Sequence, residues 1–146
     1  MPYVRVWVHM NWTTKNKERI ITPGLKRQLL PHILENAAEK HIYIDTVNCV
    51  EDHIHLVISL GATQTLSKIA QLIKGESSRW VNVSGLLKRK FEWQDDYFAI
   101  SASESAIPYI RRYIENQEEH HRRKSYEEEY DEYIKGHAPA PPTPPT

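Results

Sequence analysis

Two histidines separated by a single residue are the side chains in this sequence with the clearest chemical potential. His53 and His55 lie at the start of an apolar run, residues 54–60, that predicts a strand. Because alternate residues of a strand project from the same face, the two imidazoles would lie about 7 Å apart along the backbone and could converge on one ion. The pair therefore predicts a metal site on one face of a sheet.

A tyrosine and a glutamine four residues apart could complete such a site. Helical spacing would place Tyr113 and Gln117 on one face of a helix. A phenol has a pKa of about 10, so only about 0.1% is ionised at neutral pH. A divalent ion held by the two imidazoles and the amide oxygen would neutralise a phosphate and allow Tyr113 to attack it. Tyr109 is a rival nucleophile, whereas His120 and His121 are interpreted as a solvated helix end rather than as ligands.

The periodicity of the chain predicts the elements that must position these groups. Strands are expected over residues 3–12, 42–50, 53–60 and 97–101, and helices over 25–40, 65–81 and from a cap at Ser103 or Ser105 to about 121. The order predicts an α+β, ferredoxin-like βαββαβ sandwich with an antiparallel sheet, one face covered by helices and one face free. Residues 1–135 form a single domain in this interpretation, with a charged helix near its end, and residues 136–146 form a Pro-rich, disordered tail.

The charge balance, the single cysteine and the first ten residues exclude several classes of protein. The 146 residues carry 19 basic and 19 acidic side chains, which argues against an indiscriminate polycation. Any surface that binds nucleic acid must therefore be local. Cys49 is the single cysteine, which excludes an intrachain disulfide and a zinc site built from several thiolates. The first ten residues are too short to span a bilayer and lack a cleavage pattern, so a cytoplasmic protein that does not enter the membrane is expected.

The second predicted helix has a basic side. Leu66, Ile69, Ile73 and Trp80 fall within a narrow arc, and the basic residues Lys68, Lys74 and Arg79 fall opposite that arc. These three side chains are candidates for contacts with a DNA backbone. The alternative is that they solubilise the outer face of the helix, which is the usual meaning of such charges.

Four segments, in this order, carry a resemblance to a known family. The sequence DHIHLV at residues 52–57, KGESSRW at 74–80, WQ at 93–94 through Tyr97, and YIENQEEHH at 113–121 resemble the HUH single-tyrosine transposases of small insertion sequences, which include IS200-like and repeat-associated tyrosine transposases. The resemblance extends from about residue 3 to residue 135.

The resemblance implies a transposase that acts on single-stranded DNA and recognises hairpins near the ends of its element. It would cut and rejoin through a covalent 5′-phosphotyrosine. His53 and His55 match the metal-binding histidines, Tyr113 the nucleophile and Gln117 the third ligand. The cofactor would be Mg²⁺ or Mn²⁺, of which the nitrogen-containing ligand set favours manganese. The family further implies a homodimer, in which the tyrosine helix can serve the partner's histidines in trans.

Two hypotheses of other classes remain open at this stage. The chain could be a non-catalytic, ferredoxin-like module, a domesticated relative that binds nucleic acid on its free sheet face. It could also be a self-associating protein whose histidines bind metal incidentally. The presence of His53, His55 and Tyr113 together favours the enzyme over both.

Overall fold

The computed structural model describes residues 2–119, 125, 128 and 131 of the chain. The helices and strands of this part are β1 (Trp7–Thr13), α1 (Pro23–Glu39), β2 (Tyr43–Cys49), β3 (His53–Ser59), α2 (Leu66–Ser84), β4 (Phe98–Ala102) and α3 (Ile107–Glu115). Two short 3₁₀ turns, η1 (Lys15–Lys17) and η2 (Glu104–Ala106), come before α1 and α3.

The strands form one sheet in the order β2-β3-β1-β4. Every neighbouring pair is antiparallel, and β1 and β3 lie at the centre. This order, with one helix after β1 and another after β3, confirms the ferredoxin-like α+β sandwich. The first strand begins at Trp7 rather than near residue 3, so the alternating residues before it lie outside the strand.

Local sequence signals set the ends of the first two helices. The hydroxyl oxygens of Thr22 and Thr65 accept hydrogen bonds from the backbone N–H groups of Leu25 and Lys68, which caps α1 and α2. Gly85 ends α2 in the left-handed region, at φ +70°, where a residue without Cβ is favoured. These caps explain why both helices begin close to the predicted positions.

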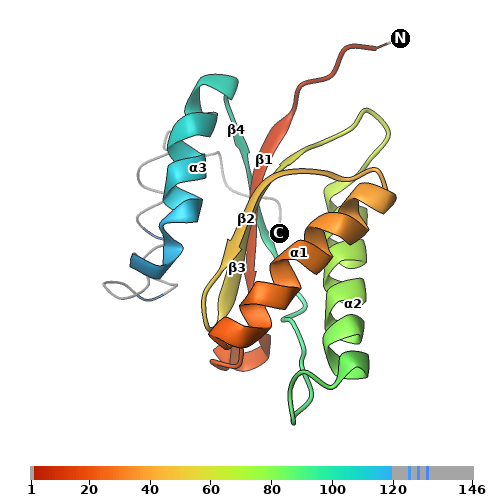
Figure 1. Ribbon diagram of the computed structural model, residues 1–146. Helices are drawn as coiled ribbons and strands as arrows, with labels where there is room; N and C mark the ends of the chain where they lie inside the picture. Colours follow the sequence, from red (N-terminus) through yellow and green to blue (C-terminus); the bar gives the residue numbers. More distant parts are fainter. Residues whose placement is uncertain (1, 120–124, 126–127, 129–130, 132–146) are drawn as a thin grey trace.

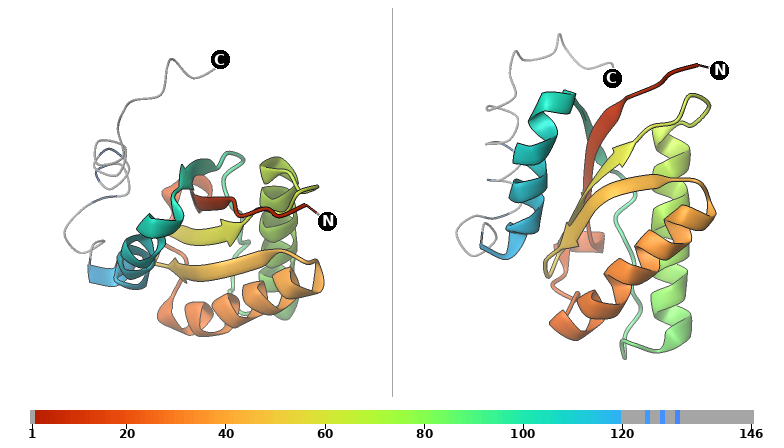
Figure 2. Two further views of the ribbon diagram at one scale, coloured as in Figure 1. Left: turned by 90° about the horizontal axis from the view of Figure 1, so that it is seen from above. Right: turned by 45° about the horizontal axis from the view of Figure 1, so that its top comes forward.

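The sheet has two differently covered faces. Helices α1 and α2 lie on one face and α3 lies on the other, as Figures 1 and 2 show. The strand residues that alternate toward α1 and α2 form the main hydrophobic core with them, and the strand members of that core include Val8, Met10, Trp12, Ile54, Leu56 and Ile58. A second, smaller cluster lies beneath α3 and contains Val57, Ile107, Ile110 and Ile114.

The expectation of a free sheet face is therefore wrong. Ile107, Ile110 and Ile114 form an apolar stripe that must leave water, and the face around Val57 is where they are buried. The proposed capping of this helix by Ser103 or Ser105 is also wrong, because the residue before α3 is Ala106 and it makes no side-chain cap. A module that stacks bases on an open face is no longer supported by the fold.

Helix α3 is shorter than the sequence predicts. It ends at Glu115, turns at Asn116, and residues 117–119 return to a helical conformation. No helix among the described residues is long and apolar enough to cross a membrane. The predicted helix near residue 130 and the Pro-rich tail, residues 136–146, lie largely outside the described part of the chain, as do His120 and His121.

Candidate active site

Both histidines of β3 face α3 and are buried beneath it. His53 is 0% exposed and His55 is 4% exposed. Each imidazole is held through its Nδ1 atom: that of His53 lies 2.7 Å from the carboxylate Oδ1 of Asp52, and that of His55 lies 2.9 Å from Nε2 of His9. The nitrogen left to bind an ion is therefore Nε2 in both rings. The ring centroids of His53 and His55 are 5.0 Å apart.

Gln117 approaches the first of these histidines from the end of α3. Its side chain is fully buried, and its amide nitrogen donates a hydrogen bond to the backbone carbonyl of Tyr113 at 3.2 Å. Because a carbonyl oxygen can only accept, this bond fixes which end of the amide faces the histidine. The amide oxygen of Gln117 lies 3.3 Å from Nε2 of His53. The sequence spacing had predicted this convergence.

Tyr113 lies beside the histidines of its own chain. Its ring centroid is 5.8 Å from that of His55 and 6.3 Å from that of His9, edge to face in both cases. The side chain is half-buried, and it packs against the small cluster beneath α3. Tyr109, the rival nucleophile, is 60% exposed. The structure therefore brings Tyr113, His53, His55 and Gln117 into one place within a single chain.

The end of α3 is fastened to the sheet by an amide from β2. Asn48 donates hydrogen bonds from its side-chain nitrogen to the backbone carbonyls of Ile114 and Glu115, at 2.9 and 3.3 Å. Carbonyls in the last turn of a helix have no partner within the helix, so the sheet supplies one here. Asn48 is buried, and the two carbonyls that it binds lie between Tyr113 and Gln117 in the sequence. These bonds therefore hold Tyr113 and Gln117 close to the histidines.

Two ion pairs reinforce the docking of α3. The guanidinium of Arg111 makes two hydrogen bonds to the carboxylate of Asp45 on β2, at 2.8 and 3.1 Å. The pKa of Asp45 is lowered, chiefly by the hydrogen bond from Arg111 and against the opposing effect of burial. Beyond the helix end, the ammonium of Lys26 on α1 lies 2.7 Å from the carboxylate of Glu118. Both pairs hold α3 against elements on the β2 side of the sheet.

The donor atoms at this site suit a divalent ion. Among the residues that the structure describes, no three His, Cys, Asp or Glu side chains are arranged so that they could hold a metal ion, so an ion would need the amide of Gln117 beside the two imidazoles. If Nδ1 of His53 donates its proton to Asp52, Nε2 is the nitrogen that could bind an ion, and it faces the amide oxygen of Gln117. Two ligand atoms each about 2.1 Å from one ion lie about 3 Å apart, which matches their separation. The residues present therefore fit a divalent metal.

The three basic side chains predicted to bind DNA lie elsewhere. Lys68 and Arg79 are exposed on α2, which covers the opposite face of the sheet from His53 and His55. Lys74 is half-buried, and its ammonium donates hydrogen bonds to the backbone carbonyls of Asp95 and Asp96 at 2.7 and 3.2 Å. Burial lowers the pKa of Lys74, against the opposing charges of the two aspartates. The structure does not bring these three residues to the histidines.

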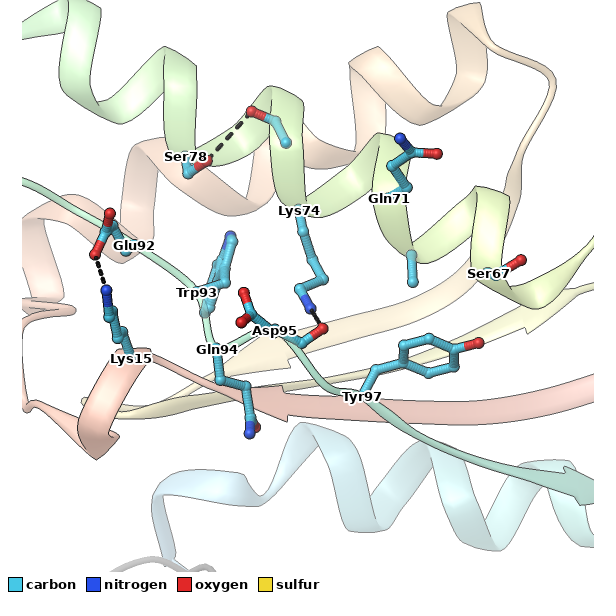
Figure 3. A pocket seen from close by; sticks show the side chains of 12 residues that line it. Lys15, Ser67, Gln71, Lys74, Ser78, Glu92, Trp93, Gln94, Asp95 and Tyr97 are labelled. Atoms are coloured by element: carbon cyan, nitrogen blue, oxygen red, sulfur yellow. Dashed lines mark hydrogen bonds and ion pairs between the residues drawn. The ribbon is translucent and has the colours of Figure 1, made fainter. Parts of the chain in front are cut away.

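Lys74 lines a cavity of about 440 Å³ between α2 and the segment that leads into β4. Figure 3 shows its side chain pointing from α2 toward Asp95, with Trp93, Gln94 and Tyr97 along the same segment. Trp93 is only 7% exposed and donates its indole N–H to the hydroxyl of Ser77 at 2.9 Å. This residue is therefore part of the core wall rather than an open surface for stacking.

Sequence reasoning missed two residues of the site. Asp52 precedes His53 directly, so a carboxylate beside a predicted metal-binding histidine was a local signal. His9 had only a weak signal, because nothing in the sequence fixes how β1 and β3 align. In the structure Asn11 lies opposite His55, which puts His9 on the diagonal and on the same face.

Known proteins resemble this chain over most of its length. A family model described as "Transposase IS200 like" matches residues 3–117. The ISDra2 transposase TnpA of Deinococcus radiodurans is 26% identical over 114 residues, which cover 75% of this chain and 81% of the relative.

Solved structures show the same fold. A crystal structure of a transposase from Deinococcus radiodurans superposes with a TM-score of 0.64 at 22% identity, over 80% of this chain and 95% of that one. The structure of a REP-associated tyrosine transposase bound to a REP hairpin has a TM-score of 0.60 at 17% identity, over 83% of this chain and 72% of that one. Since the family model spans most of the described chain, the protein belongs to the IS200-like transposase family.

Proposed function

We propose that this transposase cuts and rejoins single-stranded DNA through a covalent phosphotyrosine on Tyr113. The observation that carries the proposal is the edge-on approach of the Tyr113 ring to His55, 5.8 Å between ring centroids, with Gln117 on the same helix end beside His53. Those four side chains supply a nucleophile and a set of metal ligands in one place. No other tyrosine of α3 lies beside the histidines in this way, because Tyr109 points to solvent.

The chemistry is a transfer between two oxygens. The phenol oxygen of Tyr113 would attack the phosphorus, the bond from phosphorus to the 3′ oxygen would break, and the proton lost by the phenol is balanced by one gained at the 3′ hydroxyl. The product is a 5′-phosphotyrosine and a free 3′ hydroxyl. Because the phosphotyrosine keeps the bond energy, a 3′ hydroxyl can reverse the step and rejoin the strand without a nucleotide cofactor.

His53, His55 and Gln117 would hold a divalent ion, Mg²⁺ or Mn²⁺, with manganese favoured by the two nitrogen ligands. When bound, the ion supplies charge neutralisation at the phosphate and at the departing oxygen. Asp52 orients His53 through its Nδ1–H, and Asn48 holds the end of α3 in place. Tyr113 is thereby kept beside His55 while the strand enters.

The substrate in this proposal is single-stranded DNA with hairpins near the element ends. A structural relative is recorded bound to a REP hairpin, which supports this substrate class. A homodimer is proposed from the resemblance. Because Tyr113 lies beside the His55 of its own chain, we infer that each subunit carries a complete site in cis, rather than lending its tyrosine helix in trans.

Covalent capture tests the proposal. The full chain is incubated with labelled single-stranded oligonucleotides that contain hairpins, with Mn²⁺ or with a chelator, and is then resolved under denaturing conditions. We expect an adduct that requires Mn²⁺ and disappears in Tyr113→Phe. The matched control is Tyr109→Phe, which removes a phenol one helical turn away and should leave the adduct intact. An adduct in Tyr113→Phe would overturn the assignment of the nucleophile, and binding without any adduct would overturn the proposed chemistry.

A further inference from the structure

His9 of β1 makes the most unusual contact in the site. Its side chain is 1% exposed, and its Nε2 atom lies 2.9 Å from Nδ1 of His55. The two rings are tilted by 36° with centroids 5.1 Å apart, so the contact is a hydrogen bond in the ring planes rather than a stack. A single proton must lie between these two nitrogens. Which histidine carries this proton decides whether Nε2 of His55 has a lone pair that can bind a metal ion.

The two possible positions of the proton have opposite consequences. If neutral His9 carried it on Nε2, Nδ1 of His55 would accept, and the proton of neutral His55 would sit on Nε2, where it blocks a metal. If His55 carries it on Nδ1, His9 accepts, and Nε2 of His55 keeps its lone pair. Metal binding therefore needs His9 to act as the acceptor.

The same arrangement recurs at the other histidine. Asp52 is an acceptor at Nδ1 of His53, and it leaves Nε2 of that ring facing Gln117. A carboxylate can only accept, so it settles the proton position by itself. At Nδ1 of His55 the corresponding contact is made by the imidazole of His9. The carboxylate of Asp52 and the imidazole of His9 would thus each accept an Nδ1–H and leave Nε2 of the neighbouring histidine for the ion.

We propose that His9 is a positioning residue that accepts the Nδ1–H of His55 and so directs the Nε2 lone pair of His55 toward a divalent ion. The inference rests on the proposed function, because it assigns His9 a task in the same metal site. It also explains why an imidazole is buried in β1 among residues that face an apolar stripe, where an aliphatic side chain would pack without a polar group to satisfy.

Two substitutions separate this role from simple packing. His9→Gln keeps an amide oxygen that can accept from His55, whereas His9→Leu fills a similar volume without any acceptor. Mn²⁺ affinity is measured on the full chain by titration, together with the melting temperature of each variant without metal. We expect His9→Leu to weaken Mn²⁺ binding by about 10- to 100-fold, the usual effect of losing a partner behind a metal ligand. His9→Gln should stay within a few-fold of the unmodified chain.

A measurement on the unmodified chain keeps the proposal testable if His9→Leu does not fold. Long-range ¹H–¹⁵N spectra of the metal-free protein report which ring nitrogen of His55 carries the proton. We expect the proton on Nδ1, and a proton on Nε2 would overturn the proposal. Equal Mn²⁺ affinity in His9→Leu and the unmodified chain, or equal losses in His9→Leu and His9→Gln, would overturn it as well. By contrast, a chain that binds Mn²⁺ but forms no adduct refutes the proposed function alone.

Discussion

The carboxylate of Asp52 lies 2.7 Å from Nδ1 of His53, its neighbour along the chain, at the point where the turn between β2 and β3 becomes the strand. Asp52 is 8% exposed, so this bond is sheltered from water. An ionised carboxylate at Nδ1 raises the electron density at the opposite nitrogen and holds the ring still. The bond therefore connects the β2–β3 turn to the proposed metal site.

The first prediction follows from this bond. Asp52→Ala should weaken Mn²⁺ binding by about 10- to 100-fold, because His53 loses the acceptor that fixes its proton and its orientation. Asp52→Asn, which keeps an acceptor oxygen but not the charge, should lose less. Titration with Mn²⁺ measures both. The adjacent, exposed Glu51→Ala serves as the control, and an Asp52→Ala affinity equal to that of the control would contradict the role.

A second prediction concerns which chain supplies the nucleophile. Tyr113→Phe and His55→Ala should each abolish the DNA adduct, and mixing the two variants should not restore it, because the phenol and the imidazole of one site come from one chain. The measurement is adduct yield after the variants have been unfolded and refolded together. Recovery of adduct in the mixture would mean that α3 serves the partner's histidines.

A third prediction addresses the basic side of α2. If Lys68 contacts phosphate, Lys68→Glu should lower affinity for single-stranded DNA and reduce the salt dependence of binding by about 0.7 in the log–log slope. Mn²⁺ affinity should not change, since α2 and the histidines lie on opposite faces of the sheet. Arg27→Glu, the same charge change at an exposed position of α1, is the control. An equal loss in both variants would indicate an effect of net charge.

A fourth prediction tests the fastening of α3. Asn48→Ala removes the donor for two helix-end carbonyls and should destabilise the fold by about 1–3 kcal/mol. Adduct formation should also slow, because Tyr113 and Gln117 lose their common anchor. Denaturant unfolding and single-turnover rates measure the two effects. Asn48→Asp keeps the shape without the donor, so it should behave like Asn48→Ala; wild-type behaviour in Asn48→Asp would contradict the role of the hydrogen bonds.

A fifth prediction uses the buried thiol. Burial raises the pKa of Cys49 to about 12, from an ordinary value of 9.0, so the native thiolate fraction at pH 8 falls by a factor of about 1000. Labelling by a thiol reagent at pH 8 should therefore be much slower in the native chain than in the urea-unfolded chain. Similar rates for native and unfolded chains at pH 8 would contradict this.

Local patterns in the sequence were enough to predict part of the site. Strand alternation placed His53 and His55 on one face, and helical spacing placed Gln117 beside the backbone of Tyr113, because both relations involve residues close in the chain. The ferredoxin-like order of elements was also predictable. Helix α2 was correctly predicted to be amphipathic, but its position on the far side of the sheet was not predictable from its own residues.

The relations that were missed all join distant segments. The hydrogen bond of His9 to His55 depends on the alignment of β1 with β3, and that of Asn48 depends on where α3 docks. Neither alignment is encoded by periodicity, since sliding a strand by two residues keeps the same side chains inward. The covering of the second sheet face by Ile110 and its neighbours follows from the same docking.

The β2–β3 hairpin has a mechanical consequence. Strand β2 carries Asn48, which donates hydrogen bonds to the end of α3, the helix of Tyr113, and strand β3 carries His53 and His55. The proposed nucleophile, Tyr113, and the imidazoles are thus both attached to this two-stranded hairpin. If DNA binding bends or twists the sheet, the hairpin should move as one unit, so the phenol of Tyr113 would move together with the imidazoles and their alignment would be kept.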